Sequence, residues 1–134
     1  PKKIYSEPID LFVAGFIGSP SMNLIEGEVE NGFFIAKGAK IPVQFSDRRD
    51  VVLGVRPEDL EIVEKERAAI EAPVYALELT GESTLVTVKD SATSICVRGS
   101  ADFEANIDEV CYIAPRTSEK LHLFDKSTGE RLNS

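Results

Sequence analysis

Apolar and polar residues alternate with a period of two along most of the chain after residue 22, which is the pattern of half-buried β-strands. In residues 85–89, for example, this alternation places Val86 and Val88 on one face. Asn31 and Gly32 separate two such segments and indicate a tight hairpin, because both tolerate a positive φ. The predicted strands are Asn23–Glu30, Phe33–Lys37, Ile41–Phe45, Val51–Val55, Ile62–Glu64, Ala69–Leu79, Leu85–Lys89, Ser94–Arg98, Glu109–Ala114 and Lys120–Phe124. Short strands separated by Gly and Asx turns predict a barrel or a sandwich.

Two prolines interrupt this pattern. Pro57 begins the segment PEDL and predicts a single helical turn over residues 57–60, because proline presets the φ of a first helical residue. Pro73 lies inside the long segment 69–79 and cannot donate a ladder hydrogen bond, so its part of that strand is expected at an edge or a bulge.

The first residues of the chain have a different period. Ser6 can cap a helix whose end is set by Gly18 and Pro20. The apolar stripe of this predicted helix consists of Ile9, Phe12, Val13, Phe16 and Ile17. Such a stripe needs a cover, which is either the chain's own domain or a neighbour that this chain does not include.

Composition narrows the class of protein. The chain has 134 residues, which predicts one domain, and a net charge of −8. The charge opposes a nucleic-acid surface, because phosphate binding needs clustered Lys and Arg. No run of apolar residues in the sequence is long enough for a membrane span.

Few side chains suggest catalysis or metal binding. Cys96 and Cys111 form no CxxC pair and are expected to be buried core residues of a reducing compartment rather than zinc ligands or a disulfide. His122 is the single histidine, lies between two leucines, and is expected to have a structural role, bonding a loop. The sequence also lacks GxxxxGK[ST], the phosphate-binding loop of many ATPases. We therefore predict no catalytic residue, no metal site and no autonomous enzyme.

Four motifs in the same order resemble one family. They are residues 4–29 (IYSEPIDLFVAGFIGSPSMNLIEGEV), 53–60 (LGVRPEDL), 79–88 (LTGESTLVTV) and 120–132 (KLHLFDKSTGERL). Together they resemble the region after the nucleotide-binding domain in ATP-binding subunits of ABC importers of the maltose, multiple-sugar and glycerol-3-phosphate type. The resemblance implies a mainly β fold, an OB-fold-like (TOBE) barrel with additional strands and a short N-terminal helix. It further implies a junction helix in residues 1–22, after a nucleotide-binding domain that is missing here. Residues 23–134 would be the regulatory domain, with two interleaved strand sets dividing near residues 64–68.

The resemblance also implies a function. The chain would be the non-catalytic regulatory and dimerisation domain of an ABC-transporter ATPase subunit. Its partners would be its own nucleotide-binding domain, a second copy of the subunit, the membrane subunits and a regulatory protein. It would hold no cofactor, because ATP and Mg²⁺ would bind in the missing domain. The complex would lie in the cytoplasm, peripheral on the inner face of the cell membrane.

Two segments are candidate contact sites under this resemblance. The predicted junction that faces the ATPase half consists of Gly18, Ser19, Pro20, Met22 and Asn23. The predicted dimer contact loop consists of Arg56, Pro57 and Glu58. A purely structural interpretation of this loop, in which Arg56 and Glu58 pair and lock the turn, is equally compatible with the sequence.

Two other functions compete with this one. Some TOBE domains bind oxyanions, and Ser83 and Thr84 after Gly81, with Lys89 nearby, could supply the hydroxyl groups, amides and cation of such a site. An OB fold that binds nucleic acid is the third alternative, which the charge of −8 and the absence of tryptophan oppose.

Overall fold

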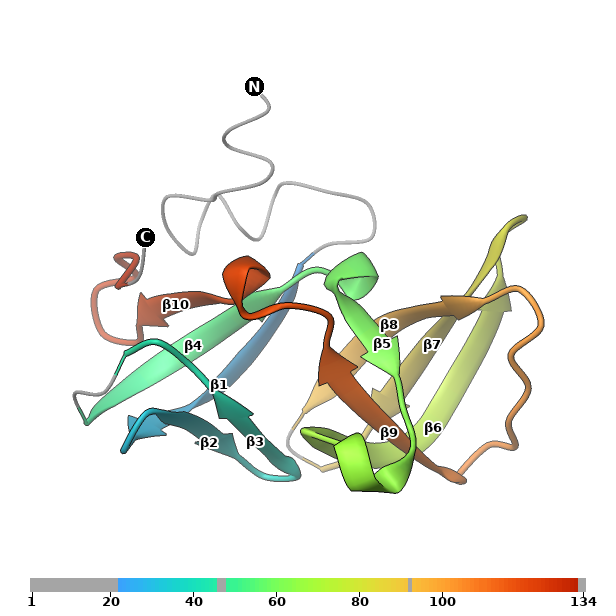
Figure 1. The fold of residues 1–134 in the computed structure, drawn as a ribbon, viewed down its shortest axis with the longest axis horizontal. Helices are drawn as coiled ribbons and strands as arrows, with labels where there is room; N and C mark the ends of the chain where they lie inside the picture. The colour runs from blue at the N-terminus through green and yellow to red at the C-terminus, as the bar shows by residue number, and fades with distance from the viewer. Residues whose placement is uncertain (1–21, 46–47, 92, 133–134) are drawn as a thin grey trace.

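The computed structural model describes residues 22–45, 48–91 and 93–132, which are built mainly of β-strands (Figure 1). In chain order the elements are β1 (Asn23–Glu30), β2 (Phe33–Ala36), β3 (Ala39–Pro42), β4 (Arg49–Val55), the 3-10 turn η1 (Pro57–Asp59), β5 (Leu60–Ile62), the 3-10 turn η2 (Lys65–Arg67), β6 (Ile70–Leu79), β7 (Ser83–Lys89), β8 (Ser94–Ser100), β9 (Val110–Pro115), the 3-10 turn η3 (Ser118–Lys120) and β10 (His122–Asp125). The predicted mainly β class is confirmed, and the curled sheet fits an OB fold. The predicted N-terminal helix lies outside the described residues.

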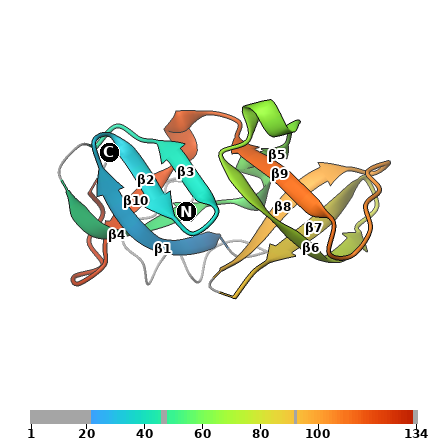
Figure 2. The ribbon, with the colours of Figure 1, turned by 90° about the horizontal axis from the view of Figure 1, so that it is seen from below.

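The first strand set has the order β10-β4-β1-β2-β3 (Figure 2). The predicted hairpin joins β1 to β2, with Glu30 opposite Phe33 and with φ values of 54° at Asn31 and 81° at Gly32. These are the positive φ values that a two-residue turn requires. β10 comes from the end of the chain and pairs with β4, so residues from both ends of the sequence build this set.

The second strand set is organised by the long strand β6. Its first part, through Pro73, pairs with β9, and its second part, from Val74, pairs with β7. β8 then pairs with β7, and β5 pairs with β9. The irregularity predicted for β6 is present, but the register shift lies between Val74 and Ala76, whereas Pro73 is paired with Val110.

One hydrophobic core extends through both strand sets. Val29 and Leu53 from the first set and Val86 and Val97 from the second are fully buried in the same cluster. In β1, β3 and β8 buried and more exposed residues largely alternate, because alternate side chains of a strand point to opposite faces. In β4, by contrast, every residue from Val51 to Val55 is buried. This shared core fixes the surface loops of the two sets relative to each other.

Some element boundaries differ from the prediction. Residues 41–45 were predicted as a strand, but β3 begins at Ala39, because the β2–β3 pairing places Ala39 opposite Ala36. Residues 62–64 were predicted as a strand, but β5 begins at Leu60, directly after η1. The predicted helical turn at Pro57 is confirmed as η1. None of the helical segments that the structure describes has the length and apolarity to cross a membrane.

Candidate functional site

Asn23, predicted at the junction, links the two strand sets. Its side chain is 7% exposed, its Nδ2 donates to the Cys96 carbonyl at 2.8 Å, and its Oδ1 accepts from the Cys96 amide at 2.8 Å. The side-chain amide of Asn23 thus bonds both the amide and the carbonyl of Cys96 on β8, as the backbone of a neighbouring strand would. This contact gives Asn23 a structural role within the chain, while its contact with another domain stays a prediction.

Met22, the preceding junction residue, packs on the other face of the first strand set. It is 4% exposed and contacts Phe124 in a small cluster separate from the main core. A Cβ atom at Gly54 would lie 2.7 Å from the Met22 sulfur and 3.0 Å from the Phe124 ring. Gly54 in the LGVRPEDL motif therefore allows this close packing. The other three predicted junction residues, Gly18, Ser19 and Pro20, lie outside the described residues.

The predicted contact loop is only partly at the surface. Arg56 is 4% exposed, Pro57 is buried and Glu58 is half-buried. Pro57 begins η1, and the Asp59 amide donates to the Arg56 carbonyl at 2.9 Å. An internal hydrogen bond therefore closes the turn and leaves Glu58 and Asp59 half-buried, and the contact of this turn with a second copy stays a prediction.

Arg116, which follows β9, holds this turn from the side. Its amide donates to the Asp59 carbonyl at 2.9 Å, and its Nε donates to the Glu58 carbonyl at 3.1 Å. Its guanidinium also lies 3.6 Å from the Glu61 carboxylate, which lies 3.7 Å from Arg67. Because these ion pairs are exposed, each contributes only about 0–1 kcal/mol to stability. Their main effect is to place these charged groups close together on the surface.

We call this surface the η1 patch; its members are Glu58, Asp59, Glu61, Arg67, Arg116 and Lys120. Desolvation, reinforced by Glu58, raises the pKa of Asp59, and the charge of Lys120 opposes this rise. The patch carries three carboxylates and three cations, in contrast to the chain's net charge of −8. The sequence placed only Glu58 of this set in a contact loop. Asp59 follows it in the same turn, whereas Glu61, Arg67, Arg116 and Lys120 come from other parts of the chain; the one signal for Arg116 is an arginine directly after a strand.

His122 is buried on β10 opposite Gly54 and is 2% exposed. Desolvation and the charges of Arg131, Arg56 and Lys120 lower the pKa of His122 to about 4. Its Nδ1 atom is buried and has no hydrogen-bond partner in the described part of the chain, so the predicted bond from His122 to a loop is not formed by this atom. The imidazole is thus neutral near pH 7, as a structural residue would be.

The predicted oxyanion residues do not converge. Ser83 and Lys89 lie at opposite ends of β7, about 20 Å apart for a strand of this length. The Lys89 ammonium lies 4.8 Å from the centre of the Tyr75 ring. The Ser83 hydroxyl lies 3.0 Å from both the Thr80 hydroxyl and the Arg98 guanidinium. The hydroxyl group is thus occupied by internal contacts, and nothing in this arrangement favours a ligand.

The two cysteines are free thiols, and the reducing compartment stays a prediction. Cys111 is buried, whereas Cys96 is half-buried, and desolvation raises the pKa of both thiols. A raised pKa disfavours the thiolate that a metal or an electrophile would need. Within the described ranges, no group of three His, Cys, Asp or Glu side chains could hold a metal ion.

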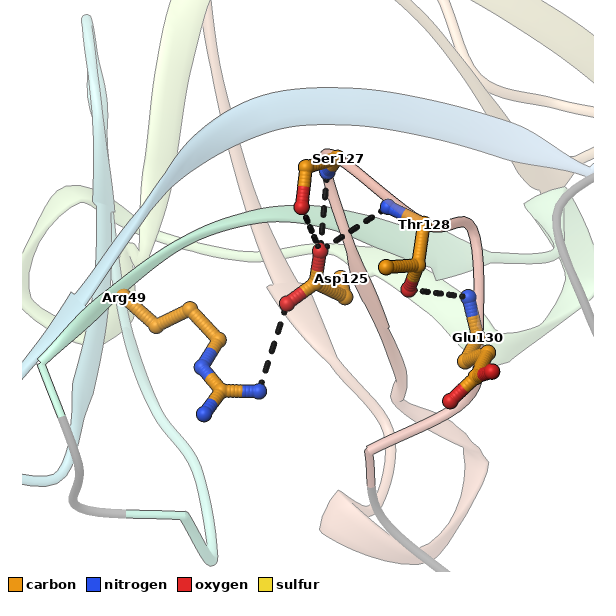
Figure 3. A network of polar contacts seen from close by, with 5 residues as sticks. All are labelled: Arg49, Asp125, Ser127, Thr128 and Glu130. Atoms are coloured by element: carbon orange, nitrogen blue, oxygen red, sulfur yellow. Dashed lines mark hydrogen bonds and ion pairs between the residues drawn. The ribbon is translucent and has the colours of Figure 1, made fainter.

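The segment after β10 is organised by Asp125 (Figure 3). Its Oδ1 accepts from the Ser127 amide at 2.8 Å, from the Ser127 hydroxyl at 2.6 Å and from the Thr128 amide at 3.0 Å. Its Oδ2 lies 3.2 Å from Arg49. The Ser127 hydroxyl bond is the main cause of a lowered pKa of Asp125. The DKSTGE segment of the last motif therefore forms an Asx turn with a structural role.

Comparison with known proteins assigns this fold to a class. Residues 18–60 match a family model described as the MalK OB fold domain. The diacetylchitobiose uptake system ATP-binding protein MsiK of Streptomyces coelicolor is 34% identical over 158 residues, which cover 98% of this chain and 42% of that protein. The sn-glycerol-3-phosphate import ATP-binding protein UgpC of Yersinia enterocolitica is 34% identical over 146 residues, covering 100% of this chain and 40% of UgpC. An uncharacterized ABC transporter ATP-binding protein, YcjV of Escherichia coli, is 31% identical over 140 residues, covering 96% of this chain and 38% of YcjV.

The predicted resemblance is confirmed by these matches. Residues 18–60 carry the match to the MalK OB fold domain, and the curled sheet fits such a fold. The chain is homologous, over almost its whole length, to ATP-binding subunits of ABC transporters, among them subunits of sugar-type importers. It spans about two fifths of the length of these relatives.

Proposed function

We propose that this chain is the non-catalytic regulatory and dimerisation domain of an ABC-transporter ATP-binding subunit that energises import of a sugar or sugar-like solute. The observation that carries the proposal is the homology to ABC-transporter ATP-binding proteins over 96–100% of the chain, two of which are named for uptake of diacetylchitobiose and import of sn-glycerol-3-phosphate. In the parent subunit, ATP and Mg²⁺ would bind in a nucleotide-binding domain outside these residues. That subunit would sit with its membrane partners on the cytoplasmic face of the membrane.

The η1 patch supports a contact between two copies. In a dimer with two-fold symmetry, each copy contributes the same surface, so that surface must be complementary to itself. A patch with three carboxylates and three cations meets this condition, because Glu58 of one copy can pair with Arg116 of the other, and the reverse. The buried Arg56 and Pro57 would then hold Glu58 in place without touching the second copy.

The fold supports a role as a tether. Two ATP-binding subunits close on ATP and separate after hydrolysis, and a contact outside the moving halves would keep the pair together. The common core and the Asn23–Cys96 link make the two strand sets one unit. A regulatory protein that binds this unit could therefore change how readily the pair opens.

Sedimentation equilibrium of the chain and of charge-reversal variants tests the proposed contact. The variants are Glu58→Arg and Arg116→Glu, and Glu66→Arg on η2, an exposed residue outside the patch, is the matched control. In a two-fold dimer each charge reversal changes two ion pairs between the copies. We therefore expect the free energy of dimerisation to weaken by about 1–2 kcal/mol, which raises Kd about fivefold to thirtyfold. A chain that stays monomeric up to about 1 mM contradicts dimerisation by this domain. Equal effects of all three variants contradict the assignment to the η1 patch.

A further inference from the structure

The core-side face of β6 is uncovered at its far end. Leu77 pairs with Val86 and Leu79 pairs with Thr84, and cross-strand partners point to the same face of a sheet. Val86 and Thr84 are 0% and 5% exposed, whereas Leu77 is 37% and Leu79 is 68% exposed. Two leucines on the core side of the sheet are therefore only partly covered.

The connection from β8 to β9 forms the opposite wall of a groove along this face. Leu77 and Leu79 line a hollow of about 550 Å³ together with Phe103. A second hollow of about 560 Å³ shares Leu77 and Phe103 and continues toward Glu109. We call these two hollows the β6 groove.

The wall of the β6 groove is anchored at both ends. The Phe103 amide donates to the Ser100 carbonyl at 3.1 Å. The Asp108 amide donates to the Val74 carbonyl at 2.8 Å, and the Val74 amide donates to the Glu109 carbonyl at 2.8 Å. The groove is therefore formed before any partner arrives, which lowers the entropic cost of binding.

The charges at the β6 groove are all negative. Asp102, Glu104 and Glu109 line it, and among the described residues no Lys or Arg does. In a two-fold contact through this groove, a second copy of the chain would bring the same carboxylates and be repelled. An apolar floor with an acidic wall instead complements a segment whose apolar side chains lie beside Lys or Arg.

We propose that the β6 groove is the docking site for a basic, amphipathic segment of a regulatory protein. The proposal rests on the regulatory function proposed above and supplies its partner chemistry. Apolar side chains of the segment contact Leu77, Leu79 and Phe103, and its cations face Glu104 and Glu109. The site lies on the second strand set and uses no residue of the η1 patch, so the chain can bind a second copy and a regulator at the same time.

Binding of a short labelled peptide of alternating leucine and lysine to the whole chain tests this proposal. Fluorescence anisotropy measures Kd, and amide chemical shifts show where the peptide lies. We expect shifts concentrated at residues 77–79 and 101–106, and a Kd raised about tenfold by the double change Leu79→Ser and Glu104→Lys. Leu24→Ser and Glu66→Lys, half-exposed or exposed changes on other elements, are the matched controls and should leave Kd within about twofold.

Three results would overturn the docking proposal. These are no peptide binding, an equal loss of affinity in the control variants, and chemical shifts that lie outside the groove. None of them depends on self-association, so sedimentation of the same wild-type chain shows independently whether the proposed dimerisation holds.

Discussion

Protonation of His122 should weaken the fold as the pH falls from about 6.5 to about 4. In the unfolded chain the imidazole has its ordinary pKa of about 6.5, whereas in the folded chain its pKa is about 4. Between these pH values His122 is protonated in the unfolded chain and neutral in the folded chain, so the free energy of unfolding decreases as the pH falls. The difference between the two pKa values corresponds to about 3 kcal/mol of folding stability. About 2–3 kcal/mol of this stability is already lost at pH 4.5.

The comparison with His122→Gln isolates this effect from the carboxylates. Asp59 and Asp125 also have shifted pKa values, but they are present in both proteins. Urea unfolding followed by circular dichroism at pH 7 and pH 4.5 gives the free energy of unfolding of each protein. We expect the wild-type chain to lose about 2–3 kcal/mol more than the variant between these pH values. Equal losses, or an imidazole that titrates near its ordinary pKa in the folded chain, would refute the reasoning.

Two further predictions concern packing and the link between the strand sets. Asn23→Ala removes both hydrogen bonds to Cys96 and leaves the amide and carbonyl of Cys96 without this partner. We therefore expect the free energy of unfolding in urea to fall by about 2–3 kcal/mol. The control Asn106→Ala, at an exposed site, should lower it by less than about 1 kcal/mol. Gly54→Ala places a Cβ atom 2.7 Å from the Met22 sulfur, and we expect a loss of about 1–3 kcal/mol in the same assay. In the Gly54→Ala background, Met22→Ala should lower the free energy of unfolding by less than it does in the wild-type chain. Strictly additive losses would show that the contact with Met22 is not the cause of the Gly54→Ala effect.

Local signals in the sequence predicted the parts of the fold that depend on neighbouring residues. The hairpin at Asn31 and Gly32 follows from the φ values that these residues tolerate, and η1 follows from the fixed φ of Pro57. The strand β3 was placed too late, because its limits depend on pairing with β2 and not on its own pattern of apolar residues. Local pattern therefore identified most elements and the first residue of β1, β2 and β8, but it missed where β3 and β5 begin.

Contacts between distant residues could not be predicted in this way. Asn23 was assigned to a junction because of its motif, but its side chain binds Cys96, which lies 73 positions away. Arg116 joins Glu58 only because β9 pairs with β5, which follows η1 directly. No periodicity in the sequence encodes such pairings, so the η1 patch and the β6 groove emerge only from the three-dimensional structure.

The most direct test of the central claim, two-fold association through the η1 patch, is to mix two self-repelling variants. In Glu58→Arg each of the two 58–116 pairs across the contact joins two cations, and in Arg116→Glu each joins two carboxylates. A dimer of one copy of each restores both pairs of opposite charge. We predict that each variant alone sediments as a weaker dimer or a monomer, and that the equimolar mixture recovers the Kd of the wild-type chain within about threefold. A mixture that associates no better than its two components would contradict the account.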